Sequence, residues 1–219
     1  MSGSPFSDLV EITALSLAVS GAATLISILI GLPIGTWLAL SRMRSRGMIL
    51  SVVNTGMALP PVVVGLAVAL LLWRSGLLGG LGLMYTPGAM VIAEVVIAAP
   101  VMAGLTVAGL GQLDPRLQIQ LQGLGASRWQ TVWWLWREAR LPLLAAVMAA
   151  FGSVISEVGA AMMVGGNIAH QTRVLTTSIV LETGRGQFGN AIVLGLVLLT
   201  LAFIVNGILT WAQQRGPRP

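Results

Sequence analysis

The chain has 219 residues, of which 56% are hydrophobic and only 9% are charged, whereas a soluble globular domain carries about 25% charged residues. Cysteine is absent and histidine occurs once, which excludes disulfides, thiolate ligands and histidine clusters, so we expect no metal site. All twelve basic residues are arginine, which excludes the lysine-containing loop that binds ATP phosphates.

Five apolar blocks follow one another along the chain. Each is long enough to cross a hydrocarbon core of about 30 Å, which takes roughly 20 helical residues. Lipid offers the backbone no hydrogen-bond partners, so we expect an all-α integral membrane protein with five transmembrane helices in a single domain, residues 1–219. The predicted spans are 9–40, 48–73, 87–110, 143–164 and 188–211, with a polar loop at 111–142.

Two of these spans carry further local signals. The first block is too long for the core of a signal peptide, so we expect it to be retained as a span. The second block contains Pro60 and Pro61 near its middle. Proline removes a helical hydrogen bond and clashes with the preceding turn, so a kink is expected there.

The arginines predict the orientation of the chain in the membrane. Nine of them fall on one side of the predicted spans and three on the other. The nine are Arg42, Arg44, Arg46, Arg116, Arg128, Arg137, Arg140, Arg215 and Arg218, and the three are Arg74, Arg173 and Arg185. The positive-inside rule makes the first side cytoplasmic, with the N-terminus outside and the C-terminus inside. The arginines form no aromatic-interleaved patch, so we expect no nucleic-acid partner.

The polar loop between the third and fourth spans predicts two short helices. Asp114 and Pro115 form a strong helix start, an N-cap acid followed by proline at the first helical position. Glycine is the usual residue after a helix end, so this helix is expected to stop near Gly123 or Gly125. A second helix is expected to start at Ser127, which leaves a glycine corner between the two.

The second helix of the loop has a tryptophan stripe. Ser127 and Gln130 have the spacing of a capping box, and Trp129, Trp133 and Trp136 then recur at helical spacing along one face. Tryptophans on an interfacial helix at the lipid headgroups would give this pattern. A surface that docks a partner protein would give it too, and periodicity alone does not separate the two.

The corner of the loop resembles a known motif. Leu124, Gly125, Ala126 and Ser127, followed by Arg128, resemble the core of the EAA loop of ABC importer permeases. In that family the loop is cytoplasmic and its short helix fits a cleft in the ATPase subunit. The resemblance therefore implies that these five residues form an ATPase-coupling loop.

Segments further along the chain resemble the molybdate/tungstate branch of the same permease family. They are Ile155-Ser156-Glu157-Val158-Gly159-Ala160, Gly165-Gly166-Asn167-Ile168 and Thr172-Arg173-Val174-Leu175-Thr176-Thr177. The run Met162–Asn167, with Leu181-Glu182-Thr183, looks closest to tungstate permeases. The five-span core that such proteins share covers the whole chain.

This resemblance implies partners and a location. The chain would be a homodimer in the bacterial plasma (inner) membrane, with the path on its axis. Two ATP-binding cassette subunits, which hold ATP and Mg, would bind on the cytoplasmic side, and an external oxyanion-binding protein would bind outside. The chain itself would be a non-catalytic permease subunit without a cofactor of its own.

The translocation path and its gate are expected to involve Glu157, Asn167, Arg173, Thr176 and Thr177. A fixed carboxylate on the path would repel a tungstate dianion. Glu157 is therefore expected near the outer end of its span, where it accepts hydrogen bonds from the glycine-rich segment that follows.

Other single residues leave alternatives open. Arg173 and His170, on the predicted outer side, could receive an oxyanion, contact the binding protein or be solvated loop residues. Glu94 has no cationic partner nearby in the sequence and is assigned no role. With Glu157, it is one of the two acids that could hold a coupling ion in a secondary transporter, the first rival reading.

The predicted function is import of an oxyanion, tungstate, delivered by an external binding protein. Molybdate and sulfate are also tetrahedral dianions, so the sequence leaves them open. A membrane anchor of a redox enzyme is the second rival, but that role requires histidines for haem, and the chain has one.

Overall fold

The computed structural model describes residues 5–41 and 43–214, and over this part of the chain every regular element is a helix. The elements are α1 (Pro5–Leu40), α2 (Arg46–Met57), α3 (Pro61–Leu72), η1 (Gly79–Leu81), α4 (Pro87–Gly111), α5 (Pro115–Gly123), α6 (Arg128–Glu138), α7 (Arg140–Ile155), α8 (Gly159–Gly165), α9 (Leu175–Gly184) and α10 (Phe188–Gln214). The prediction of an all-α fold is confirmed. Arg42, Arg215 and Arg218 lie outside the described residues.

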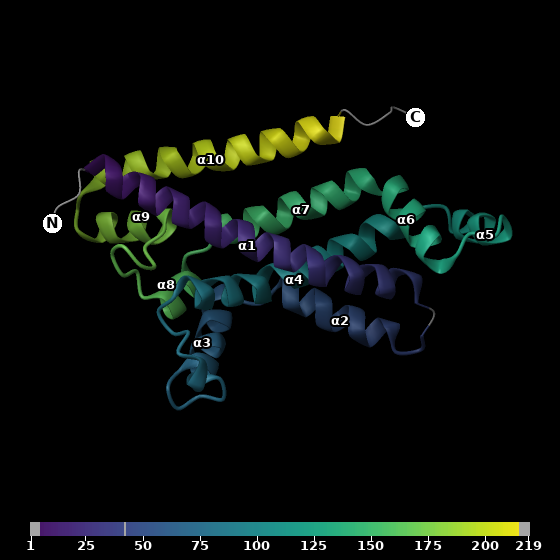
Figure 1. The fold of residues 1–219 in the computed structure, drawn as a ribbon, viewed down its shortest axis with the longest axis horizontal. Coiled ribbons are helices and arrows are strands. Elements are labelled where there is room, and N and C mark those ends of the chain that lie inside the picture. The colour runs from purple at the N-terminus through teal and green to yellow at the C-terminus, as the bar shows by residue number, and fades with distance from the viewer. Residues whose placement is uncertain (1–4, 42, 215–219) are drawn as a thin grey trace.

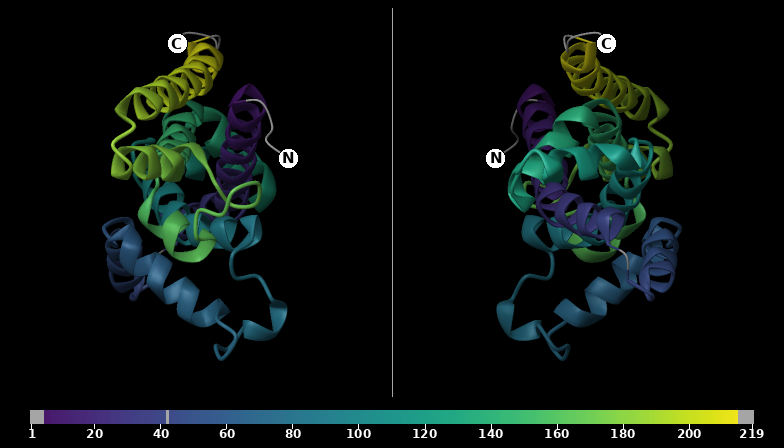
Figure 2. Two further views of the ribbon diagram at one scale, coloured as in Figure 1. Left: turned by 90° about the vertical axis from the view of Figure 1, so that its left-hand side faces the viewer. Right: turned by 90° about the vertical axis from the view of Figure 1, so that its right-hand side faces the viewer.

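The long helices form one elongated bundle. Helices α1, α4, α7 and α10 run along its long axis, and α2 lies against α4 (Figure 1). The α5–α6 pair lies at one end of the bundle, and α8, α9 and the start of α1 lie at the other (Figure 1). The two end-on views show α3 and the turn after it projecting from the side of the bundle (Figure 2).

Three helices in the described part of the chain are long and apolar enough to cross a membrane unbroken. They are Ser7–Leu40 within α1, Pro87–Gly111, and Phe188–Trp211 within α10. Two bent pairs, α2 with α3 and α6 with α7, also have sufficient length and hydropathy, at angles of 98° and 76°. The number of spans is therefore three, or up to five if each bent pair crosses once.

The prolines of the predicted second span turn the chain through a near right angle. Helix α2 ends at Met57, Pro60 is extended with φ −62° and ψ 122°, and Pro61 takes the first position of α3. A proline disfavours the helical conformation of the residue before it, so Pro60 cannot continue α2. The predicted kink is thus a full change of direction.

The predicted fourth span, 143–164, is interrupted in the structure. Helix α7 ends at Ile155 and α8 begins at Gly159. Glu157 lies in the break, and its Oε1 accepts a hydrogen bond from the Ala160 backbone N–H at 3.0 Å. The carboxylate thereby satisfies a donor in the first turn of α8 that has no partner within the helix.

Two glycines bring α1 and α4 into close contact. A Cβ on Gly31 would lie 2.8 Å from the carbonyl oxygen of Ala99, and one on Gly35 would lie 2.5 Å from that of Ala103. Small residues four apart let membrane helices approach closely enough for backbone packing. The contact along α1 and α4 therefore depends on the absence of side chains at these positions.

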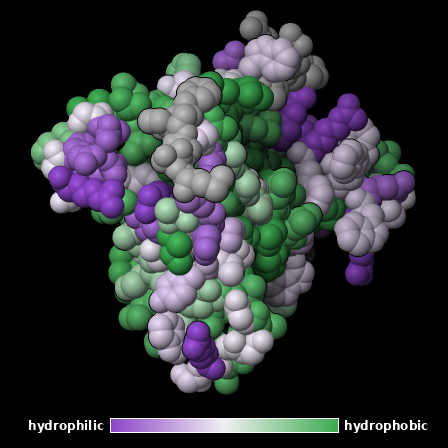
Figure 3. All heavy atoms as spheres, turned by 60° about the vertical axis from the view of Figure 1, so that its left-hand side comes forward, coloured by the Kyte–Doolittle hydropathy of each residue, from purple (hydrophilic) through white to green (hydrophobic). Residues whose placement is uncertain are grey.

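Much of the outside of the bundle is apolar. Figure 3 shows wide hydrophobic areas, with hydrophilic residues gathered in separate patches. Along the most apolar stretch of α10, no residue is buried within the chain. Such a surface is stable in lipid or against another apolar surface, and it would be a liability in water.

Candidate functional site

The glycine corner of the predicted coupling loop is closed by backbone hydrogen bonds. Helix α5 ends at Gly123, and Gly125 has φ +84°. The Gly125 N–H donates to the Gln122 carbonyl and the Ala126 N–H to the Leu121 carbonyl, both at 3.0 Å. This pair of bonds is a Schellman motif, which requires a left-handed residue and therefore favours glycine. The predicted helix end is confirmed.

Both helices of the corner begin as the sequence predicts. The Asp114 carboxylate accepts from the Arg116 N–H at 2.8 Å. The Ser127 hydroxyl accepts from the Gln130 N–H at 3.3 Å, and the Gln130 side-chain oxygen accepts from the Ser127 N–H at 2.8 Å. The capping box is thus complete, and it follows the Schellman motif directly.

Apolar side chains are exposed at the corner. Leu124 is 85% exposed and Trp129 is 81% exposed, and Trp133 is also exposed. Figure 1 shows α5 at the far end of the molecule, beyond the ends of α1 and α2. Exposed apolar side chains gathered at one place mark a contact surface for protein or membrane.

The third tryptophan of the stripe faces the bundle instead. The indole N–H of Trp136 donates to the Thr36 hydroxyl of α1 at 2.8 Å. Next to it, Leu135 is buried with Leu110 of α4 and Ala139 in one apolar cluster. Of the three tryptophans predicted to form one exposed stripe, Trp129 and Trp133 are exposed and Trp136 is not. The reason is that α6 runs from the glycine corner onto the bundle, so its second half contacts α1 and α4.

Residues 165–177 lie at the end of the bundle opposite the glycine corner and comprise the last residue of α8, a loop and the start of α9. Three of the loop residues have positive φ: Gly166 at +70°, Asn167 at +52° and His170 at +61°. Asn and His adopt this region more readily than most residues that carry a Cβ. The chain can therefore turn tightly here over the ends of α8 and α9.

Hydrogen bonds join the five residues predicted for the path and gate into two groups. Arg173 donates from Nε to the Asn167 side-chain oxygen at 3.3 Å, and the Asn167 amide donates to the Thr177 carbonyl at 3.4 Å. The Thr176 hydroxyl donates to the Glu157 carbonyl at 2.9 Å. All five therefore lie at the end of the bundle opposite the glycine corner.

The two threonines are buried and support the start of α9. Thr177 accepts from the Val174 N–H through its hydroxyl at 3.1 Å, an N-terminal cap for the helix. Both Thr176 and Thr177 are buried. Of the five, Arg173 lines the large outer pocket, whereas Glu157 and Thr176 line a small internal cavity.

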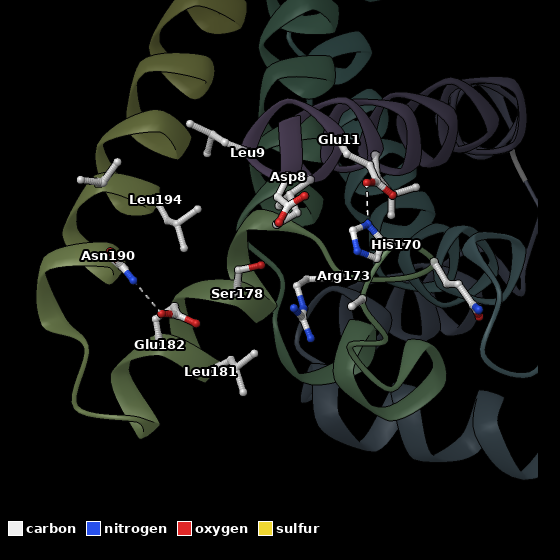
Figure 4. Close-up of a pocket in the computed structure, with 15 residues that line it drawn as sticks. Asp8, Leu9, Glu11, His170, Arg173, Ser178, Leu181, Glu182, Asn190 and Leu194 are labelled. Carbon is white, nitrogen blue, oxygen red and sulfur yellow. Dashed lines mark hydrogen bonds and ion pairs between the residues drawn. The ribbon is translucent and has the colours of Figure 1, made fainter. Parts of the chain in front are cut away.

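The outer pocket lies between the start of α1, the loop, α9 and α10, and has a volume of about 520 Å³. Figure 4 shows Arg173 and His170 on the loop, with Asp8 and Glu11 on α1 and Glu182 on α9. Three carboxylates thus face one arginine and one histidine. This mixed lining gives an oxyanion no net electrostatic attraction.

An ion pair ties the loop to α1. His170 Nδ1 lies 2.8 Å from Glu11 Oε2. The hydrogen bond to Glu11 and the charge of that carboxylate raise the pKa of His170, Asp8 adds to the effect, and Arg173 opposes it. Ligand atoms of Asp8, Glu11 and His170 lie within 4.8 Å of one another. This group could not be recognised in the sequence, because Glu11 and His170 are 159 positions apart.

Residues 31–215 match the family described as binding-protein-dependent transport system inner membrane component. The chain belongs to this family. It is therefore the membrane-embedded permease subunit of a binding-protein-dependent transporter. The matched segment contains the glycine corner, the break at Glu157 and the outer loop, but it begins after Asp8 and Glu11.

Three similar proteins are described as permeases of anion, tungstate and molybdenum transport systems. A protein of Haloferax volcanii described as a probable anion ABC transporter permease is 38% identical over 214 residues, covering 95% of this chain and 92% of its own length. The tungstate uptake system permease protein TupB of Peptoclostridium acidaminophilum is 38% identical over 200 residues, covering 91% and 88%. The molybdenum transport system permease protein ModB of Escherichia coli is 28% identical over 210 residues, covering 91% of both chains.

Solved structures of ABC transporters share the fold of this permease. An inward-facing structure of the MetNI methionine transporter aligns with a TM-score of 0.74 at 23% identity, covering 98% of this chain and 97% of the other. An amino acid ABC transporter crystallised with histidines aligns with a TM-score of 0.68 at 17% identity, covering 99% and 100%. The predicted permease fold is confirmed.

Proposed function

We propose that this permease imports tungstate. The main support for tungstate as the cargo is the 38% identity to a tungstate uptake permease over 91% of the chain. The anion permease of equal identity supports the same class of cargo. The molybdenum permease is 28% identical over a similar length, so molybdate is the second candidate.

The proposed assembly is a homodimer with two ATPase subunits and an external binding protein. Its ATP and Mg would be bound by the ATPase subunits, and this chain would hold no cofactor. The unburied apolar face of α10 and the projecting α3 support association with lipid and a second copy. The exposed Leu124 and Trp129 at the corner support docking of an ATPase subunit, with Gly125, Ala126, Ser127 and Arg128 as the rest of that surface.

The proposed mechanism is alternating access driven from the glycine corner. Closure of the ATPase subunits would move α5 and α6, whose internal caps make them one stiff unit. The Trp136 hydrogen bond to Thr36 and the packing of Leu135 against Leu110 would transmit that movement to α1 and α4. At the other end, the network of Glu157, Asn167, Arg173, Thr176 and Thr177 would form the outer gate.

Selection of tungstate would reside in the external binding protein. A path that releases its cargo requires weak binding, whereas a capture protein can enclose it. The carboxylates beside Arg173 support this division, because they offset the attraction of one arginine for a dianion. We therefore expect that exchanging the binding protein alters selectivity more than replacing Arg173.

Uptake measurements test the cargo. Cells that depend on this permease should accumulate tungsten from low external tungstate, and a tenfold excess of molybdate should compete only weakly. Cells without it should not accumulate tungsten. If molybdate is taken up equally well and competes equally, tungstate must be given up as the preferred cargo.

The proposed orientation has the N-terminus outside and the C-terminus in the cytoplasm. The absence of cysteine allows a direct test with single-cysteine variants. Gly80 follows α3 and a side chain there meets no atom within 4 Å, and Ser45 precedes α2 and is exposed. In intact cells, Gly80→Cys should react with an impermeant thiol reagent and Ser45→Cys should not. Reversed labelling would overturn the orientation.

A further inference from the structure

A small polar cavity lies inside the bundle, apart from the outer pocket. The centre of a water-sized sphere can occupy about 10 Å³ of it, which is close to the space that one water molecule requires. It is lined by Ser16, Val19, Ser20, Glu94, Val154, Ile155, Glu157, Val174 and Thr176. Helix α1, helix α4, the break between α7 and α8, and the start of α9 therefore meet around it.

Glu94 is the most deeply buried acid of these elements. It lies in the N-terminal third of α4 and is 3% exposed. Within the described part of the chain, its Oε2 is buried and has no hydrogen-bond partner. Buried polar groups are nearly always hydrogen-bonded, so such an atom calls for a partner in the cavity that it lines.

The neighbouring side chains do not neutralise a charge on Glu94. Among the described residues that line the cavity, the other charged side chain is Glu157, and the rest are neutral. Two ionised carboxylates around one small cavity would repel each other in a medium of low dielectric constant. An unpaired buried charge is also strongly disfavoured, and the acid binds a proton instead.

The hydrogen bonds around the cavity distinguish the two acids. The Glu157 carboxylate accepts from the Ala160 N–H at 3.0 Å, whereas Glu94 Oε2 has no hydrogen-bond partner among the described residues. The Ser16 hydroxyl is already engaged, since it donates to the Ile12 carbonyl and accepts from the Leu175 N–H. The Thr176 hydroxyl donates to the Glu157 carbonyl. The proton is therefore expected on Glu94.

We propose that Glu94 is a proton-binding site of this permease, and that one water molecule in the cavity accepts a hydrogen bond from the Glu94 acid and donates one to the Glu157 carboxylate. The water would join α4 to the break between α7 and α8 without an ion pair. This inference does not depend on the cargo, and it concerns no residue of the glycine corner.

Infrared spectroscopy of the purified permease complex in lipid nanodiscs tests the proposal. A protonated carboxylic acid has a carbonyl band separate from that of a carboxylate. At neutral pH the wild type should show this band, and Glu94→Gln should lose it. Glu138→Gln, which changes an exposed acid on α6, should retain it. In Glu157→Gln the band should persist but shift, because the hydrogen-bond partner of the bridging water is no longer charged.

Several outcomes would overturn the proposal. A wild type without the band has an ionised Glu94, and a band that survives Glu94→Gln belongs to another acid. A band that appears only when sodium is replaced by choline means that the cavity binds a metal cation rather than a proton. If Glu94→Gln does not fold, the Glu157→Gln spectrum decides, and a band at the wild-type position there refutes the bridge.

Discussion

Replacing Gly35 with alanine will force α1 away from α4. The added Cβ would lie 2.5 Å from the Ala103 carbonyl oxygen and 2.7 Å from the Thr106 Cβ. Neither of these two α4 atoms can easily move away from an added Cβ. The first belongs to the α4 backbone, and the second belongs to a fully buried side chain whose hydroxyl donates to the Met102 carbonyl at 2.7 Å.

The size of the effect follows from these distances. Ordinary van der Waals contact for a Cβ begins at 3.4 Å, so the closest gap must widen by about 0.9 Å. Overpacking of this kind costs about 1–3 kcal/mol of stability. Alanine is favoured over glycine inside a helix by about 0.8–1.0 kcal/mol, which offsets part of that cost.

Gly21→Ala is the matched control, because it lies on the same helix and a Cβ there meets no atom within 4 Å. It should gain the helix preference without the clash. Gly35→Ala should therefore be less stable than Gly21→Ala by about 1–3 kcal/mol. Denaturant unfolding in detergent micelles, followed by circular dichroism, measures this difference. If Gly35→Ala is as stable as Gly21→Ala, α1 and α4 do not pack as closely at Gly35 as described here.

Three further predictions address the glycine corner, the contact of α6 with α1, and the outer loop. Gly125→Val should cost about 1–2 kcal/mol at its positive φ and should abolish binding-protein-stimulated ATP hydrolysis while the amount of permease in the membrane is maintained. Arg116→Gln, the control, should reduce this hydrolysis less. Full stimulation in Gly125→Val would exclude a coupling role for the corner. Trp136→Phe should lose about 1 kcal/mol with its hydrogen bond to α1, seen as a lower unfolding midpoint, and an unchanged midpoint would refute that contribution. Because Glu11 raises the pKa of His170, their ion pair is complete below pH 6.5 and is lost as the pH rises through the raised pKa. Hydrogen exchange of the loop should increase over that range relative to His170→Gln, and equal profiles would contradict the ion pair.

The helix ends of the glycine corner could be predicted because their signals are local. Asp114, Gly125 and Ser127 act on backbone groups within a few residues of themselves, so the sequence pattern contains the whole interaction. The all-helical fold was predictable for a related reason. Apolar blocks in lipid have few other ways to satisfy their backbone.

Features that depend on tertiary contact could not be predicted. Trp136 has the helical spacing of the exposed stripe, but Thr36 of α1 supplies its partner. The pairing of Glu11 with His170 joins residues 159 positions apart. Hydropathy also gave no sign of the break at Glu157, because apolar residues continue on both sides of it and only the packed structure shows α8 starting anew.

For Glu94, the sequence indicates an unusual environment but not the residues that form it. An acid in the middle of an apolar block is unusual and indicates a special environment. Its sequence neighbours are all uncharged, so the sequence offered no partner and no role. The helices that enclose it are far apart along the chain, and only their assembly brings a second acid to the same cavity.

The backbone hydrogen bonds that fix the shape of the glycine corner also affect how a partner protein binds there. Ordering a flexible segment costs about 1–2 kcal/mol per residue in backbone entropy. Here the Schellman motif and the capping box order the corner when the chain folds. A partner that docks there meets a shape already fixed, so little ordering cost recurs at each encounter. Such a contact can be small, reversible and repeated without loss of specificity.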